Sequence, residues 1–143
     1  TPAANSPSLR ATTAGSIIGS GANAFRILRE TSYADMLDAV RVTWATREPT
    51  AAELVELDEL YLRHAKLDAY SIAPLIAGTP VLLLDGSKDR AVPAATGDLL
   101  ASRLREPTRW SKPVGHELLF AGLALWVPDI LDWLDGRVAE SAE

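Results

Sequence analysis

The sequence contains no cysteine, and this absence removes several kinds of site. Disulfide bonds, thiolate metal sites and a cysteine nucleophile are excluded, while the cellular compartment stays open. Basic residues are also few: 14 Lys and Arg stand against 19 Asp and Glu, which gives a net charge of −5, and they are scattered along the chain. Such a chain has no electrostatic footprint for nucleic acid or anionic lipid, so we predict no nucleic-acid partner.

Long hydrophobic runs are missing as well. The longest apolar stretch, from Leu118 to Pro128, is too short and too interrupted by glycine to cross a bilayer, so we predict no membrane span. With 48% hydrophobic and 23% charged residues among 143 positions, the composition is that of one ordinary globular domain.

The first residues lack an initiator Met and the basic-then-apolar layout of a secretory signal. We therefore expect that Thr1 results from processing, cleavage or truncation. An N-terminal threonine can act as a nucleophile with its own α-amine as base. The residues that follow Thr1 are rich in Pro, Ser and Ala, however, and they predict a flexible tail over residues 1–12 instead.

The most informative stretch runs from Thr79 to Pro93. Its first half, Thr79–Gly86, holds an unbroken run of large aliphatic residues, which predicts a parallel strand buried on both faces. A polar loop with Asp89 follows, and His116 follows a second, weaker candidate strand. Groups at the carboxyl ends of neighbouring parallel strands lie at the same edge of the sheet. Asp89 and His116 can therefore meet through a hydrogen bond, as the acid–base half of a catalytic triad.

The run Pro80–Pro93, followed by Gly115-His116, resembles the C-terminal half of an α/β-hydrolase. In that family, a strand followed by Gly-x-x-Asp-x-x-Val-Pro carries the triad acid, and a later Gly-His carries the general base. The resemblance implies Asp89 as the acid and His116 as the base, and it covers roughly residues 14–138. It also implies the fold class, which is α/β: part of a parallel sheet flanked by helices, with a helical lid segment.

One element of the family is missing. The family carries its nucleophile in a Gly-x-Ser-x-Gly turn ahead of the acid, and no such turn occurs in this sequence. We therefore interpret residues 13–143 as the C-terminal half of an α/β-hydrolase domain, either a fragment or one chain of a split enzyme. The expected partner is the N-terminal half of the same hydrolase, in the same or a separate chain. It would supply the nucleophile and the oxyanion hole, so we expect the present chain to be inactive by itself.

The small number of candidate strands also predicts a partner segment. The sequence contains only three candidate parallel strands, and the first would present an unpaired apolar edge, which is an aggregation hazard. A partner segment that supplies the remaining strands would remove that hazard.

Two helical patterns between the first and second strands predict a lid over about residues 31–68. Met36 and Trp44 belong to the first pattern, and Thr50-Ala51-Ala52-Glu53 opens the second with the form of a capping box. Since the family often inserts a lid here, we predict Met36 and Trp44 as substrate-pocket residues. The alternative is that both are simply core residues. We interpret His64, at the edge of the second pattern, as a half-exposed helix residue and not as a second base.

The remaining elements follow from periodicity. Ile72, Leu75 and Ile76 are expected to pack under the sheet edge, and a helix is predicted over about residues 94–105. Two closing helices are predicted over residues 118–125 and 127–138. Pro128 would lie in the first turn of the second of these helices. Its buried face would be formed by Ile130, Leu131, Trp133 and Leu134.

Each candidate catalytic residue has an alternative interpretation. Asp85, at the strand end, competes with Asp89 for the acid role; we favour Asp89 because the family's acid lies in the loop. An aspartate in a Gly-Ser-Lys-Asp loop can also be a turn former. His116 can equally be a loop histidine that begins a helix at Glu117.

The segment Gly19–Ala24 matches the dinucleotide-binding pattern Gly-x-Gly-x-x-Ala after a candidate strand. That fingerprint also needs a helix, a second strand and an acidic residue about twenty positions on. No second strand is predicted before Thr79, so we interpret the segment as a glycine turn.

Three function classes stay open. The first is a serine hydrolase that acts on a small acyl substrate (an ester, amide or thioester) and needs no cofactor or metal. The second is a non-catalytic α/β-hydrolase relative used for binding or assembly. The third is a nucleotide-binding α/β domain built on Gly19–Ala24.

Overall fold

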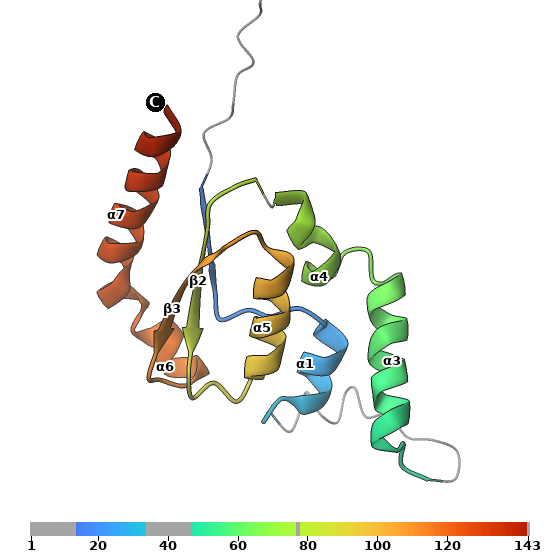
Figure 1. Cartoon of the computed structure of the whole chain (residues 1–143). Helices are drawn as coiled ribbons and strands as arrows, with labels where there is room; N and C mark the ends of the chain where they lie inside the picture. The colour runs from blue at the N-terminus through green and yellow to red at the C-terminus, as the bar shows by residue number, and fades with distance from the viewer. Residues whose placement is uncertain (1–13, 34–46, 77, 143) are drawn as a thin grey trace, which may run out of the picture.

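The computed structural model describes residues 14–33, 47–76 and 78–142 of the chain. In these residues, three strands form one parallel sheet: β1 (Gly15–Ile18), β2 (Val81–Gly86) and β3 (Thr108–Lys112). Their order is β1-β2-β3, so β2 is central. Helices flank the sheet (Figure 1), which confirms the predicted α/β class with a parallel sheet.

The helical elements lie on both sides of this sheet. Those described are α1 (Ala24–Glu30), α3 (Ala51–His64), α4 (Ala69–Ile72), the 3-10 helix η1 (Ala73–Ile76), α5 (Ala94–Arg103), α6 (His116–Ala121) and α7 (Leu123–Ala142). The helices α1, α3, α4 and α5 gather on one side of the strands, and α6 and α7 lie on the other (Figure 1). Among the described helices, none combines the length and hydropathy that a bilayer crossing requires.

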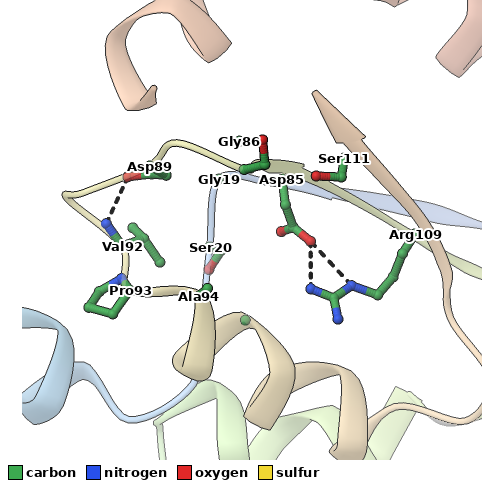
Figure 2. Close-up of a pocket in the computed structure, with 12 residues that line it drawn as sticks. Gly19, Ser20, Asp85, Gly86, Asp89, Val92, Pro93, Ala94, Arg109 and Ser111 are labelled. Carbon is green, nitrogen blue, oxygen red and sulfur yellow. Dashed lines mark hydrogen bonds and ion pairs between the residues drawn. The ribbon is translucent and has the colours of Figure 1, made fainter. Parts of the chain in front are cut away.

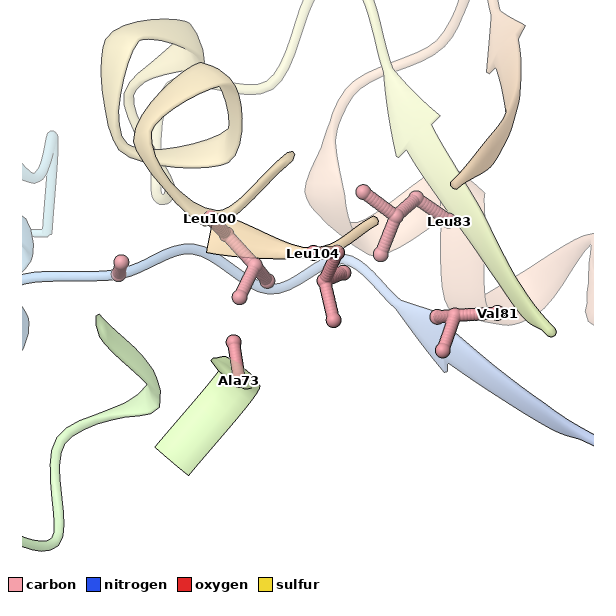
Figure 3. Close-up of a cluster of buried hydrophobic side chains, with 6 residues drawn as sticks. Ala73, Val81, Leu83, Leu100 and Leu104 are labelled. Carbon is pink, nitrogen blue, oxygen red and sulfur yellow. The ribbon is translucent and has the colours of Figure 1, made fainter. Parts of the chain in front are cut away.

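The apolar run of β2 is explained by these two helical layers. Val81 and Leu83 point into a cluster on the α5 side, and Leu82 and Leu84 point into a second cluster on the side of α6 and α7. All four side chains are at most 5% exposed. The first cluster is completed by Ala22, Ala73, Leu100 and Leu104 (Figure 3), and the second by Leu119 and Ile130. A strand buried on both faces has no polar alternation, as predicted for this stretch.

The two outer strands are less covered than β2. In the described part of the chain, β1 and β3 each pair only with β2, so one edge of each is open. Ser16 is exposed, and β3 alternates between half-buried and exposed residues, which is typical of a strand with one face in water.

Helix α3 begins with the predicted capping box. The Thr50 hydroxyl accepts a hydrogen bond from the backbone N–H of Glu53, and the Glu53 carboxylate accepts one from the N–H of Thr50 at 2.8 Å. The helix is attached to α1 by stacking of Tyr61 on Phe25, with ring centroids 5.8 Å apart, and by ion pairing. No residue of α3 is buried.

One predicted packing face is wrong, and a second is wrong at one residue. Ile72, Leu75 and Ile76 were expected under the sheet, but they are 37%, 82% and 38% exposed, and the small residue Ala73 is buried there instead. In α7, Ile130 is buried and Trp133 and Leu134 pack against its cluster as predicted, but Leu131 is 52% exposed.

The predicted break between helices 118–125 and 127–138 is also misplaced. Helix α7 is continuous from Leu123, and Pro128 lies inside it. Leu123 and Trp126 pack on the same cluster as Ile130, and this shared face holds the first turns helical despite the hydrogen bond that proline cannot donate.

The close approach of the β1–α1 turn to α5 yields a stability prediction. A Cβ atom at Gly21 would lie 2.3 Å from Oγ1 of Thr96 and 2.9 Å from its carbonyl carbon, whereas Gly136 in α7 has nothing within 4 Å. We expect Gly21→Ala to lower the free energy of unfolding by about 1–3 kcal/mol. Gly136→Ala should raise it by about 0.5–1 kcal/mol, since alanine restricts the unfolded chain. Urea unfolding of both variants checks this, and equal effects would contradict the packing described.

Candidate functional site

The loops after β2 and β3 are joined by backbone hydrogen bonds. The N–H of Ser87 donates to the carbonyl of Lys112 at 2.8 Å, and the N–H of Lys88 donates to the carbonyl of Val114 at 3.1 Å. A Cβ atom at Gly86 would lie 2.6 Å from the Val114 carbonyl oxygen, so the two loops approach this closely only because residue 86 is glycine. The loops therefore lie side by side at the carboxyl edge of the sheet.

The carboxylate of Asp89 is oriented by its own loop. Its Oδ1 accepts hydrogen bonds from the backbone N–H groups of Ala91 and Val92 at 2.8 and 2.9 Å (Figure 2 shows the bond from Val92). This is the local pattern by which aspartate stabilises turns. The side chain is 6% exposed. The second oxygen, Oδ2, is left for another partner.

That partner is His116. Its Nδ1 lies 2.8 Å from Oδ2 of Asp89, so the structure brings together the two residues that the sequence predicted as an acid–base pair. An ionised carboxylate only accepts, so Nδ1 carries the proton and Nε2 of the neutral imidazole has the free lone pair. His116 is the first residue of α6, directly after Gly115 at the N-cap. Its side chain is 25% exposed.

Two aromatic rings flank the imidazole. The Phe120 ring, four residues on in α6, lies 5.0 Å from it between centroids at 60°. The Tyr33 ring lies 6.3 Å away, edge-on at 79°. Within the described ranges, the hydrogen-bond partner of His116 is Asp89, through Nδ1, and Nε2 has none. This imidazole can therefore accept a proton at Nε2 while a carboxylate stabilises the charge at Nδ1.

Asp85, the competing carboxylate, is engaged elsewhere. Its Oδ2 accepts hydrogen bonds from Nη2 and Nε of Arg109 at 2.9 and 3.2 Å (Figure 2). Arg109 also donates to Asp98 at 2.8 Å, and these bonds to Asp98 and Asp85 raise the pKa of the guanidinium. The structure thus pairs Asp89, and not Asp85, with the imidazole.

A cavity of about 240 Å³ lies beside the pair, between the strand ends and the first turn of α5. Figure 2 shows it between Ser20, Asp85, Asp89 and Ala94. Asp89 lines this cavity, whereas His116 is not among its lining residues.

The glycine turn at Gly19–Ala24 has a different occupant from the one its pattern suggests. In dinucleotide-binding folds a phosphate accepts hydrogen bonds from the helix N-terminus. Here the carboxylate of Asp68 takes that place, accepting from the N–H groups of Asn23 and Ala24 at 2.9 and 2.8 Å. The N–H of Tyr70 and the hydroxyl of Tyr61 also donate to this carboxylate, which is 7% exposed. Asp68 therefore fastens α1, α3 and α4 together.

Sequence reasoning missed two sets of contacts. Asp68 precedes the short helix α4 as its N-cap, and that position was the available signal. Nothing local indicates that Tyr33 bonds Glu117, because the two residues are 84 positions apart.

The structure does not bring the other predicted residues to the pair within its described ranges. Met36 and Trp44 are outside the described residues, and His64 is exposed on α3. In the ranges that the structure describes, no group of three or more His, Cys, Asp or Glu side chains could hold a metal ion.

Asp68 makes stability depend on pH. Burial raises the pKa of its carboxyl, but the hydrogen bonds from three backbone N–H groups and a phenol outweigh burial and hold the pKa below its usual value. A lowered folded pKa stabilises the protein above the unfolded pKa of about 4, and this contribution is lost as the pH falls through the folded value. We expect Asp68→Asn to lower the free energy of unfolding by about 1–3 kcal/mol at pH 7. The difference in the free energy of unfolding between the parent and Asp68→Asn should become smaller below about pH 4.

Urea unfolding between pH 7 and pH 3 measures this difference, with Asp135→Asn, an exposed position in α7, as the matched control. A difference that stays constant down to pH 3, or that the control reproduces, would contradict the role given to Asp68.

Comparison of the chain with protein-family models, with curated proteins and with solved structures gives no match. Any activity assigned to this chain therefore rests on its own residues and their geometry.

Proposed function

We propose that this chain is part of a serine hydrolase of the α/β-hydrolase type, which cleaves a small ester, amide or thioester. The observation that carries the proposal is the 2.8 Å contact between Asp89 Oδ2 and His116 Nδ1 at the carboxyl edge of a parallel sheet. The acid precedes the histidine along the chain by 27 positions, and this order and separation resemble those of the acid and histidine motifs of α/β-hydrolases.

In this mechanism His116 is the general base. Its Nε2 takes the proton from a serine hydroxyl as that oxygen attacks the acyl carbon, and it then gives the proton to the leaving group. Asp89 holds Nδ1–H, which fixes the tautomer and stabilises the imidazolium while it exists. Since Asp89 Oδ1 is already bound to two backbone N–H groups, little reorganisation is needed when the charge forms.

The nucleophile and the oxyanion hole belong to the N-terminal half of the hydrolase, on the same or a separate chain. The open edge of β1 supports this assignment, because Ile17 and Ile18 are only partly buried and the strand pairs with β2 alone among the described residues. A further parallel strand on this edge would cover the two side chains and satisfy the free backbone groups. The chain by itself would then be inactive.

Residues 31–68 form the lid in this proposal. Helix α3 supports it because the helix is attached to the body at α1 and leaves apolar side chains uncovered: Val55 is 57% and Leu60 is 48% exposed. Met36 and Trp44 stay predictions as pocket residues.

The other two function classes have less support. The position of a bound phosphate at α1 is taken by the Asp68 carboxylate, which would repel an anion. A non-catalytic relative would need neither an oriented imidazole nor an Nε2 without a hydrogen-bond partner among the described residues.

Single substitutions in the protein assembled with its N-terminal half test the proposal. We expect His116→Ala to lower kcat by several orders of magnitude, because base and nucleophile act as a unit. Asp89→Asn should cost about 10⁴-fold: its amide oxygen can still accept from the loop, but its NH₂ group would face Nδ1 and impose the wrong tautomer. Asp85→Asn, the matched control, should cost less than about tenfold, since the Asp85 carboxylate is paired with Arg109 and not with the imidazole.

Steady-state hydrolysis of a short activated ester measures these effects, and circular dichroism verifies that each variant is folded. If Asp85→Asn is crippling and Asp89→Asn mild, the acid is misassigned. If His116→Ala leaves turnover intact, the hydrolase proposal fails.

A further inference from the structure

The segment after α1 lies on the loop that carries Asp89. The backbone N–H of Ser32 donates to the carbonyl of Arg90 at 2.9 Å, and Thr31, which is 2% exposed, donates its N–H to Ile27 at 2.9 Å. The N–H of Tyr33 then bonds the Thr31 hydroxyl at 3.3 Å. Backbone contacts therefore fix where the Tyr33 side chain begins, next to the acid of the pair.

The Tyr33 side chain ends on the residue that follows the candidate base. Its hydroxyl donates a hydrogen bond to Oε1 of Glu117, and its ring stands edge-on to the His116 ring at 6.3 Å. The hydrogen bond with Glu117 raises the pKa of the phenol, and the same bond lowers the pKa of the Glu117 carboxyl. At neutral pH the contact is therefore a neutral phenol bound to a carboxylate, which is a charge-assisted hydrogen bond.

A second point of support matters because one hydrogen bond does not fix an imidazole. The bond from Nδ1 to Asp89 sets the distance at one atom, but the ring can still turn about that contact and carry Nε2 away from a reacting oxygen. The Phe120 ring stands beside the imidazole from within α6, and the Tyr33 ring stands beside it from a different part of the chain. General-base catalysis requires Nε2 within about 2.6–3.2 Å of the proton donor, so small rotations are costly.

We propose that Tyr33, anchored by its hydrogen bond to Glu117, is a positioning residue that holds the His116 imidazole in the orientation needed for proton transfer. This inference rests on the hydrolase function proposed above. It also assigns a role to Glu117, which serves as the anchor of the tyrosine.

The kinetic test uses two variants of the protein assembled with its N-terminal half. Tyr33→Phe removes the hydroxyl and keeps the ring, so the anchor is lost; we expect kcat to fall about three- to tenfold with KM unchanged. Glu117→Ala removes the acceptor of the same hydrogen bond, so the anchor is lost from its other end and we expect a similar fall in kcat of about three- to tenfold with KM unchanged. A Tyr33→Phe or a Glu117→Ala enzyme that matches the parent would overturn the inference.

A spectroscopic test needs no activity. The 143 residues contain two histidines, so [¹⁵N]histidine labelling of this chain gives His116 together with the exposed His64 as an internal reference. We expect Tyr33→Phe to speed the exchange of the Nδ1-bound proton of His116 about three- to tenfold and to leave the His64 signals unchanged.

Tyr61→Phe is the matched control, because it also removes a tyrosine–carboxylate hydrogen bond, the one to Asp68, away from His116. Unchanged exchange in Tyr33→Phe, or equal changes in both variants, would overturn the inference. If the protein proves not to hydrolyse acyl substrates while only Tyr33→Phe speeds the exchange, the proposed function fails and the positioning contact stands.

Discussion

The hydrogen bonds between the loops after β2 and β3 hold the candidate site together. Parallel pairing sets Gly86 opposite Lys112, and the backbone bonds of Ser87 and Lys88 continue this pairing beyond the strand ends. Only a residue without a side chain at position 86 lets the loops come this close. An aspartate and a histidine 27 positions apart are thereby brought to 2.8 Å, and the orientation is a consequence of the sheet and its loops.

Two enclosed carboxylates of this chain, Asp68 and Asp89, use their oxygens differently. Asp68 uses both oxygens for backbone N–H groups and the Tyr61 hydroxyl, so its hydrogen-bonding capacity goes into joining helices. Asp89 uses one oxygen for its loop and leaves the other for an imidazole that is 25% exposed. A carboxylate satisfied on one side and directed at a titratable group on the other is the arrangement that proton transfer needs. Asp85 has neither arrangement, because its carboxylate forms an ion pair with the guanidinium of Arg109.

Much of the fold could be predicted from local signals. The apolar run predicted β2, the Thr50–Glu53 spacing predicted the start of α3, and the positions of Asp89 and His116 after successive strands predicted their meeting. The errors came from tertiary packing. Pro128 was expected in the first turn of a helix that begins at residue 127, but the helix already begins at Leu123, and a buried face shared with Trp126 holds α7 continuous through Pro128.

The contacts that could not be predicted join distant parts of the chain. The bond from Tyr33 to Glu117 depends on how the segment after α1 lies on the Asp89 loop, and Asp68 reaches the N-terminus of α1 from 45 positions away. The assignment as a hydrolase remains a prediction, because the residue type that would attack the substrate is identified only by the resemblance.

The most direct measurement is a crystal structure of the assembled protein after reaction with a fluorophosphonate, which modifies activated serines. Our account predicts that the modified serine lies outside residues 1–143, and that its Oγ is about 2.6–3.2 Å from Nε2 of His116. A label on a serine of this chain, such as Ser20, would contradict the account. A modified serine whose Oγ lies within hydrogen-bond distance of a different base, and not of His116, would also contradict the account.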